Sequence, residues 1–83
     1  MARRLPPTLY TQPGCDQSAR VRTWLTERGI PFTERSVSDD LAAAEALVAT
    51  GIFATPLLVV GEMRVLGFRP EQLRVALETD QPA

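Results

Sequence analysis

The order in which strand-like and helix-like segments alternate along the chain is the strongest constraint on its fold. Leu5–Thr11 has the composition of a short strand, and Pro13-Gly14 interrupts it. A helical pattern follows, from Cys15 or Asp16 to Arg28, and a second strand is expected over about Phe32–Val37. Two strands that a helical crossover connects are parallel, so we expect a parallel pair at the start of the chain.

The second half of the chain contains a hairpin between two helices. Ser38-Asp39-Asp40 provides an N-cap and an acidic first turn for a helix over Leu41–Thr50, which Gly51 closes. The connection Gly61-Glu62 is short enough to join two antiparallel strands. We place these strands at Leu57–Val60 and Met63–Leu66, and the last helix from Glu71 to about Glu78, with Pro70 in its first turn.

These segments follow the order β-α-β-α-β-β-α, which is that of the thioredoxin fold. We therefore predict an α/β protein with a four-stranded mixed sheet and helices on both faces. Residues 1–83 are expected to form a single domain, with residues 1–4 and 79–83 frayed at its ends. The residues that should turn inward are Ala19, Val21, Trp24 and Leu25 in the first helix, and Leu73 and Leu77 in the last.

The composition excludes several classes of function. The 83 residues carry a formal net charge of -1, so nothing favours nucleic-acid binding. Histidine is absent, which removes the Cys-His pair of hydrolytic cysteine enzymes and the commonest metal ligand. A single cysteine forms neither a zinc site nor a disulfide within the chain. We therefore expect no metal and no cofactor.

The hydropathy pattern of the chain favours a cytoplasmic protein. The basic start MARRLPPTLYTQ has too short and too broken an apolar run for a signal peptide. No stretch approaches the length that a membrane span requires, so we expect no membrane association. The single cysteine, which leaves no possible intrachain disulfide, also suits a reducing compartment.

The stretch QPGCDQS contains the only cysteine of the chain and is the best candidate for an active site. A cysteine at the N-terminus of a helix faces unpaired backbone N–H groups and the positive end of the helix dipole, and both favour the thiolate. Gly14 permits a tight turn that leaves the sulfur uncovered, whereas the Asp16 carboxylate opposes a second negative charge. We expect a moderately lowered pKa for Cys15. The alternative, a buried inert cysteine, fits poorly with the polar Asp16-Gln17 pair that follows.

Three segments resemble the glutaredoxin family. The run TLYTQPGCDQS is similar to its active-site segment, a strand followed by Lys-Pro-Gly-Cys-x-x-Cys or Cys-x-x-Ser. Thr55-Pro56 resembles the Thr/Val-Pro step that the family keeps in the cis form beside the thiol. The run GFRPEQL, Gly67 to Leu73, resembles the NrdH-type redoxins, which pass electrons from thioredoxin reductase to ribonucleotide reductase. Together with the order of elements, these segments extend the resemblance over nearly the whole chain.

The resemblance implies a thiol-disulfide oxidoreductase in which Cys15 attacks a disulfide and Ser18 occupies the position of a resolving cysteine. It implies thioredoxin reductase and a disulfide-bearing protein such as ribonucleotide reductase as partners. The residues that it places around the substrate or partner are Gln12, Pro13, Gly14, Asp16, Gln17, Thr55, Pro56, Gly67, Phe68 and Arg69. We expect a monomer, with a Cys15-linked dimer as the form that oxidation would produce.

Two departures from the family pattern bear on the reaction. Gln12 stands where glutathione-using members have a lysine, and Gly67 is followed by Phe68-Arg69 in place of a Gly-Gly pair with an acidic residue. Both departures disfavour glutathione. Ser18 cannot supply the second sulfur of a dithiol, so two interpretations stay open. Either an outside thiol completes the reaction, or the chain is a Cys→Ser form of a dithiol protein.

Rival interpretations concern both the function and single residues. A monothiol glutaredoxin could use a low-molecular-weight thiol or carry an iron–sulfur cluster, but that class has Cys-Gly-Phe-Ser where this chain has Cys-Asp-Gln-Ser. A non-catalytic binding module with the same fold would have an unreactive Cys15. Phe68 and Arg69 could pack at the start of a helix instead of contacting a partner, and Trp24 is expected only to cover the sheet.

Overall fold

The computed structural model describes residues 6–79, which form four strands and three helices in the predicted order. The elements are β1 (Thr8–Thr11), α1 (Asp16–Glu27), β2 (Thr33–Ser36), α2 (Leu41–Ala49), β3 (Leu57–Val60), β4 (Met63–Leu66) and α3 (Pro70–Thr79). The strands form one mixed sheet in the order β2-β1-β3-β4. The predicted β-α-β-α-β-β-α order is therefore confirmed.

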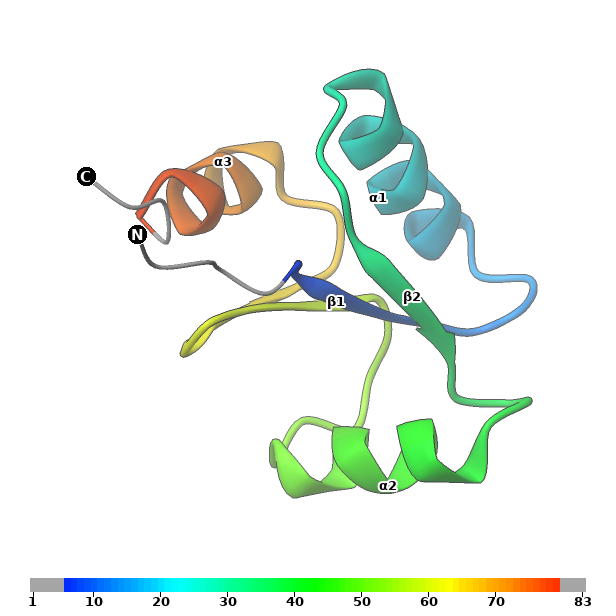
Figure 1. The fold of residues 1–83 in the computed structure, drawn as a ribbon. Coiled ribbons are helices and arrows are strands. Elements are labelled where there is room, and N and C mark those ends of the chain that lie inside the picture. The colour runs from blue at the N-terminus through cyan, green and yellow to red at the C-terminus, as the bar shows by residue number, and fades with distance from the viewer. Residues whose placement is uncertain (1–5, 80–83) are drawn as a thin grey trace.

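The pairing of the strands places β1 and β3 at the centre of the sheet. β1 runs parallel to β2, with Tyr10 opposite Arg35, and antiparallel to β3, with Leu9 opposite Leu58. β3 and β4 form the expected antiparallel hairpin. α1 and α3 cover one face of the sheet and α2 covers the other (Figure 1). This arrangement is that of the thioredoxin fold, as the sequence predicted.

The ends of several elements differ from the prediction by a few residues. β1 begins at Thr8, and β2 spans only Thr33–Ser36. Pro6 and Pro7 lack the N–H group that a strand ladder needs, although the Pro7 carbonyl accepts a hydrogen bond from the Thr33 N–H at 2.9 Å. Leu5, the expected first residue of the strand, lies outside the described residues, as do the expected frayed segments 1–4 and 80–83. Thr79, which we also expected to fray, is the last residue of α3.

The helices begin and end close to the predicted positions. The Asp40 carboxylate accepts a hydrogen bond from the Ala43 N–H at 3.3 Å, which makes Asp40 the N-cap of α2. Pro70 opens α3, where its missing N–H leaves no intrahelical bond unmade. Arg28 is the C-cap of α1 and is followed by Gly29. Thr50 is the C-cap of α2, so the expected closing glycine, Gly51, follows one position later.

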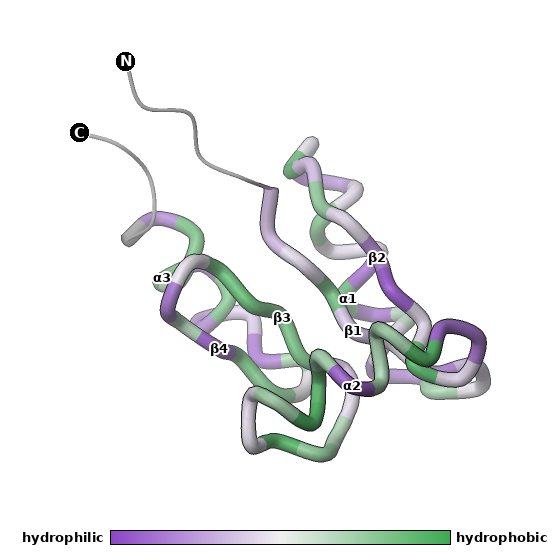
Figure 2. Tube along the Cα trace, turned by 60° about the horizontal axis from the view of Figure 1, so that its bottom comes forward, coloured by the Kyte–Doolittle hydropathy of each residue, from purple (hydrophilic) through white to green (hydrophobic). Residues whose placement is uncertain are grey.

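Two apolar clusters hold the helices against the two faces of the sheet. The cluster under α1 and α3 contains Leu9, Val21, Trp24, Leu25, Leu58, Val60, Val65, Leu73 and Ala76, with Leu77 packed at its edge. The cluster under α2 contains Tyr10, Ala43, Leu47 and Leu57. β3 contributes to both because successive side chains of a strand point to opposite faces, and its apolar run is green in Figure 2. No helix within residues 6–79 has the length and apolar character that crossing a bilayer requires.

The inward face of α1 differs from the prediction at one position. Val21, Trp24 and Leu25 are buried as expected, but Ala19 is exposed, and Ser18 is buried with 1% of its surface accessible. Positions 18, 21 and 25 follow the spacing of one helix face, so the burial of Val21 and Leu25 brings residue 18 inward as well. The prediction of a buried Ala19 was wrong because it followed hydrophobicity and not this spacing.

Candidate active site

Cys15 is the N-cap residue of α1, at the end of the turn that leaves β1. Its backbone is extended, with φ -92° and ψ 110°, and its N–H donates to the Gln12 carbonyl at 3.2 Å. The Ser18 N–H donates to Cys15 Sγ at 3.4 Å. The sulfur therefore lies at the positive end of the helix dipole, next to N–H groups that have no partner within the helix.

Gly14 leaves the turn open on the side of the sulfur. Its φ of 77° lies in the left-handed region, and a Cβ at this position would have no atom within 4 Å. Cys15 itself is partly exposed. The glycine therefore serves the backbone conformation of the turn and leaves the thiol accessible, as predicted.

The surroundings of Cys15 lower the pKa of its thiol below the ordinary value. The largest cause is hydrogen bonding from the Ser18 hydroxyl, followed by the Ser18 backbone N–H, and the Gln17 N–H and the Thr55 hydroxyl add smaller effects. Burial acts in the opposite direction. The Asp16 side chain, which we expected to oppose the thiolate, is exposed to solvent, and this weakens its effect on the thiol.

Ser18, at the position of a resolving cysteine, turns its hydroxyl into the protein. The oxygen is buried and, within residues 6–79, has no hydrogen-bond partner of standard geometry. Its proton is therefore free to rotate toward Cys15 when the thiol ionises, and a hydrogen bond to a charged sulfur is stronger than one to a neutral thiol. Ser18 thus stabilises a thiolate but offers no second sulfur.

The Thr55-Pro56 segment lies between the Cys15 turn and the turn that follows β4. The peptide bond between these two residues is cis, as the family resemblance implied. The Thr55 hydroxyl donates to Gln12 Oε1 at 3.3 Å, and the Pro56 carbonyl accepts the Gly67 N–H at 2.8 Å. The fold thus brings residues far apart in the sequence to the same side of the molecule as Cys15.

A second side-chain bridge connects α1 to the Gly67-Phe68 turn. Gln17 Oε1 accepts the Phe68 N–H at 3.1 Å. Gly67 has a φ of 81°, and a Cβ at this position would lie 3.0 Å from the same Gln17 oxygen. Both the backbone conformation and the close approach of Gln17 therefore favour glycine at position 67.

Phe68 and Arg69, which the family resemblance placed at the partner-binding surface, differ in their burial. The Phe68 ring is partly buried against the apolar cluster under α1 and α3. It lines a groove of about 330 Å³ together with α1 residues such as Ala19 and Trp24, and it does not line the pocket that contains Cys15. Phe68 thus packs against the core at the start of α3, as one of the two interpretations of the sequence allowed, and its contact with a partner stays a prediction. Arg69 is exposed.

An open pocket of about 410 Å³ borders Cys15. Four residues that the sequence analysis placed in the site line it: Gln12, Pro13, Gly14 and Asp16. The lining residues that the sequence analysis missed are Thr11, Ala19, Arg22, Glu34, Ser36 and Asp39. They come from β1, α1, β2 and the segment before α2, and the parallel pairing of β1 and β2 brings them together, so no local motif marks them.

Arg22 and Glu34 form a two-point ion pair in the wall of this pocket. Arg22 Nε and Nη2 donate to the two Glu34 carboxylate oxygens at 2.8 and 2.7 Å. The Thr11 hydroxyl donates to Glu34 Oε2 at 2.9 Å. Hydrogen bonding from Arg22, with a further contribution from Thr11, holds the pKa of the Glu34 carboxyl below its usual range. Glu34 is therefore ionised at neutral pH.

The described residues offer no metal centre. Within residues 6–79, no three cysteine or carboxylate side chains gather closely enough to hold a metal ion. The carboxylates that line the Cys15 pocket belong to Asp16, Glu34 and Asp39. The Glu34 oxygens are already occupied by hydrogen bonds from Arg22 and Thr11.

Comparison with known proteins identifies the family of this chain. The family model Glutaredoxin matches residues 8–65, a range that includes the Cys15 turn and Thr55-Pro56. The chain belongs to the glutaredoxin family. This glutaredoxin-family protein is 30% identical over 66 residues to the glutaredoxin-like protein NrdH of Lactococcus lactis subsp. cremoris, and the match covers 80% of this chain and 92% of the relative.

Solved structures of a glutaredoxin-like and a thioredoxin-like protein resemble this chain. The NrdH-redoxin from Escherichia coli is 31% identical, with a TM-score of 0.76 over 95% of this chain and 99% of that one. A thioredoxin-like protein solved by crystallography is 30% identical, with a TM-score of 0.80 over 84% of this chain and 97% of that one. Glutaredoxins of the NrdH type are thiol-disulfide oxidoreductases, and so is this protein. The predicted family, fold and enzyme class are confirmed.

Proposed function

We propose that Cys15 is the nucleophile of this thiol-disulfide oxidoreductase. The observation that carries the proposal is the position of Cys15 Sγ, which caps α1, accepts the Ser18 N–H at 3.4 Å and borders an open pocket. The hydrogen bonds at this position lower the thiol pKa, so a larger fraction of Cys15 is the reactive thiolate at neutral pH.

The reaction is a two-electron exchange between sulfur atoms. The Cys15 thiolate attacks one sulfur of a substrate disulfide, and a bond forms between Cys15 Sγ and that sulfur. The substrate S–S bond breaks, and its other sulfur leaves as a thiolate that takes up a proton. With Ser18 in the chain, a thiol of another molecule attacks Cys15 Sγ and releases the reduced substrate. A further thiol then reduces the disulfide that remains on Cys15.

We propose protein partners, with thioredoxin reductase as the reductant and a disulfide-bearing protein such as ribonucleotide reductase as the target. Gln12 has no charge for a glutathione carboxylate, and its Oε1 already accepts the Thr55 hydroxyl. Each missing charge-assisted hydrogen bond, worth about 1.5–3 kcal/mol, weakens glutathione binding by roughly one to two powers of ten. The similarity to NrdH proteins, one of them described by a thioredoxin-like activity profile, supports the same choice.

Ser18→Cys is the substitution that tests the proposed electron path. The S18C form should be reduced by thioredoxin reductase and should turn over a protein disulfide without an added small thiol, because the second attacking sulfur is then in the same chain. The serine form should stop as a mixed disulfide that is visible by mass spectrometry. Multiple turnovers of the serine form with the reductase alone would contradict the proposal. Efficient reduction of the S18C form by glutathione, with no response to the reductase, would assign the protein to the glutathione-using members.

Arg69 is the better of the two turn residues for testing partner recognition, because Phe68 also packs against the core. In the S18C background, Arg69→Ala should raise the apparent KM for thioredoxin reductase and leave the Cys15 pKa unchanged. Arg64→Ala is the matched control, since Arg64 is also exposed but lies on β4, outside the Gly67–Arg69 turn. An equal KM effect from both variants would mean that overall charge, and not the Gly67–Arg69 turn, governs reductase binding.

We further propose that the protein acts as a cytoplasmic monomer. Exchange with thioredoxin reductase requires a compartment that keeps Cys15 reduced, and the cytoplasm provides one. Analytical ultracentrifugation should show one monomeric species in the presence of a reductant. Oxidation should convert it into a Cys15-linked dimer, and a dimer that persists in the reductant would contradict this assignment.

A further inference from the structure

Glu34 makes contact with both segments that flank the Cys15 turn. It lies on β2, and it accepts the Thr11 hydroxyl at 2.9 Å from the last residue of β1. It also accepts two hydrogen bonds from Arg22 on α1, at 2.8 and 2.7 Å. Gln12 to Cys15 connect β1 to α1, so Glu34 contacts both of the elements that this turn joins.

Because Thr11 is buried, its hydroxyl needs the hydrogen bond to Glu34. Thr11 is 2% exposed, so its hydroxyl depends on Glu34 for a hydrogen bond, and a buried hydroxyl without a partner is destabilising. The side chains of Arg22 and Glu34 are 43% and 33% exposed, and both line the pocket that borders Cys15. The ion pair is therefore part of the site and not of the distant surface.

We propose that Glu34 is a positioning residue for the Cys15 nucleophile. It holds β1 at Thr11 and α1 at Arg22, the two elements that the Cys15 turn joins. Arg22 in turn neutralises the charge of Glu34. The proposal rests on the proposed role of Cys15. Without Glu34, the end of β1 and the middle of α1 lose their shared contact. Without Arg22, Glu34 presents an uncompensated negative charge to the pocket in which the thiolate forms.

The charges around the pocket determine whether each substitution raises or lowers the Cys15 pKa. The ionisable groups that line it, besides Cys15, are Asp16 and Arg22 on α1, Glu34 on β2 and Asp39 before α2. Arg22→Gln leaves Glu34 unpaired, so the thiolate is disfavoured and the Cys15 pKa rises. Glu34→Gln leaves Arg22 unpaired, so the thiolate is favoured and the Cys15 pKa falls.

The size of these shifts follows from the distance along α1. Arg22 is seven residues after Cys15, which is about 10 Å along the helix axis at roughly 1.5 Å per residue. Two unit charges at about 10 Å, in an effective dielectric of about 40–80, shift a pKa by roughly 0.3–0.6 unit. The titration should be carried out in about 10 mM salt, because the screening length is then about 30 Å and exceeds the distance between the charges.

The experiment compares R22Q, E34Q, T11V and the double variant R22Q/E34Q. The Cys15 pKa is taken from the pH dependence of the rate of reaction with the neutral probe 2,2′-dithiodipyridine. The plateau rate of exchange with a disulfide-bonded peptide, measured well above the pKa, reports positioning. R22Q should raise the pKa, E34Q should lower it, and T11V and the double variant should leave it within about 0.2 unit of the parent, since neither changes the net charge. Both should nevertheless reduce the plateau rate about threefold or more.

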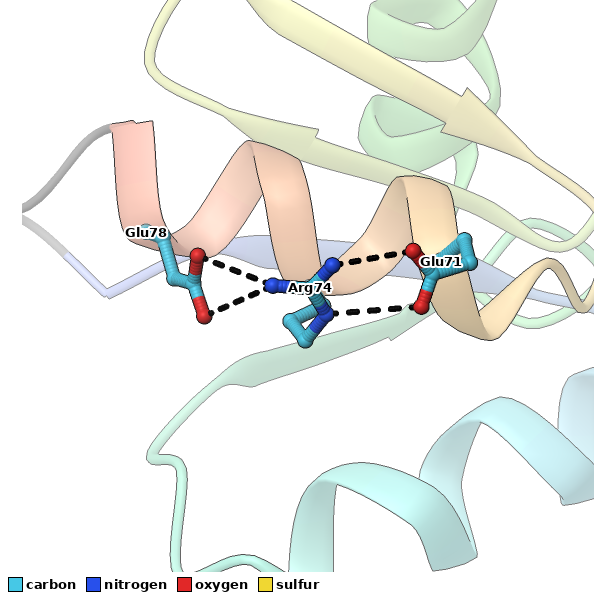
Figure 3. A network of polar contacts seen from close by, with 3 residues as sticks. All are labelled: Glu71, Arg74 and Glu78. Atoms are coloured by element: carbon cyan, nitrogen blue, oxygen red, sulfur yellow. Dashed lines mark hydrogen bonds and ion pairs between the residues drawn. The ribbon is translucent and has the colours of Figure 1, made fainter.

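Two ion pairs of Arg74 on α3 supply the matched controls. Arg74 donates to Glu71 at 2.9 Å and to Glu78 at 3.1 Å, and Figure 3 shows the three side chains along α3. None of them lines the Cys15 pocket. R74Q and E71Q therefore change the net charge by the same amounts as R22Q and E34Q, and they should leave both the pKa and the plateau rate unchanged.

Three outcomes would overturn the proposal. The first is a shift of the Cys15 pKa in the same direction in R22Q and E34Q. The second is a Cys15 pKa shift in these variants no larger than in R74Q and E71Q. The third is a plateau rate equal to that of the parent in T11V and in the double variant. If the double variant does not fold, the proposal is still tested by the signs of the Cys15 pKa shifts in R22Q and E34Q and by the plateau rate of T11V. A parent pKa at or above about 8.5 would instead contradict the proposed role of Cys15, while the differences between variants would still test Glu34.

Discussion

Replacing Gly67 with alanine tests how the structure holds the turn after β4 against α1. Gly29, Gly51 and Gly67 all have positive φ, at 66°, 83° and 81°. Alanine in this region costs roughly 1–2 kcal/mol, and the smaller entropy of the unfolded chain offsets about 0.4–1 kcal/mol of that. At Gly29 and Gly51 a new Cβ would have no atom within 4 Å, so a net loss of about 1 kcal/mol is the whole expected effect.

Gly67 differs because the new Cβ would lie 3.0 Å from Gln17 Oε1. The end of the Gln17 side chain has to shift by a few tenths of an ångström, and we expect this to break its hydrogen bond from the Phe68 N–H. A hydrogen bond of this kind contributes about 0.5–1.5 kcal/mol. Gly67→Ala should therefore reduce the free energy of unfolding by about 2 kcal/mol in total, which in a domain of this size lowers Tm by roughly 8–16 °C.

Urea unfolding of a double-mutant cycle isolates the contribution of Gln17. The cycle contains the parent, G67A, Q17A and the variant with both substitutions, and G51A serves as the control for the backbone conformation alone. In the Q17A background, G67A should cost about 1 kcal/mol, as G51A does, because the displaced side chain is already absent. Equal costs of G67A in the two backgrounds, or equal costs of G67A and G51A in the parent, would refute the reasoning.

Three other perturbations follow from single contacts. Asp40→Ala removes the N-cap of α2 and should destabilise the protein by about 0.5–2 kcal/mol in urea unfolding, and an unchanged midpoint would show that the cap contributes nothing. Ser18→Ala removes the largest cause of the lowered thiol pKa, so the thiolate absorbance near 240 nm should titrate at higher pH, and an unshifted curve would exclude this role of the hydroxyl. The Glu34 carboxyl has a lowered pKa in the folded protein, so its stabilisation is present above the unfolded value of about 4.3 and disappears as pH falls through the folded one. The Tm of E34Q should therefore fall less between pH 7 and pH 3 than that of the parent, and parallel curves would contradict this.

The sequence alone determined the order of the elements and the position of the thiol. Prolines and glycines such as Pro13-Gly14 and Gly61 separate segments whose hydrophobic periodicity differs, so each boundary is encoded within a few residues. Cys15 at the start of α1 follows from the same local signals, because a helix N-terminus is defined by its own residues. The family resemblance rests on these short segments as well.

Only the tertiary structure decided which side chains surround the thiol. Gln12 meets Thr55 across 43 residues and Gln17 meets Phe68 across 51, while Thr11 meets Glu34 across 23. Nothing in the local pattern marks these contacts, because they depend on how β1 pairs with its neighbours and on which face of α1 is buried.

The burial of Ser18 and the placement of Phe68 have the same origin. Packing of Val21 and Leu25 against the sheet turns Ser18 inward, next to the sulfur, although a serine by itself favours the surface. Phe68 packs against the core cluster under α1 and α3, while its backbone N–H donates to Gln17, and its ring lines a groove other than the Cys15 pocket. Local residues specify helices, strands and turns, whereas the environment of a functional group is set by non-local packing, in which burial outweighs the preference of any single residue.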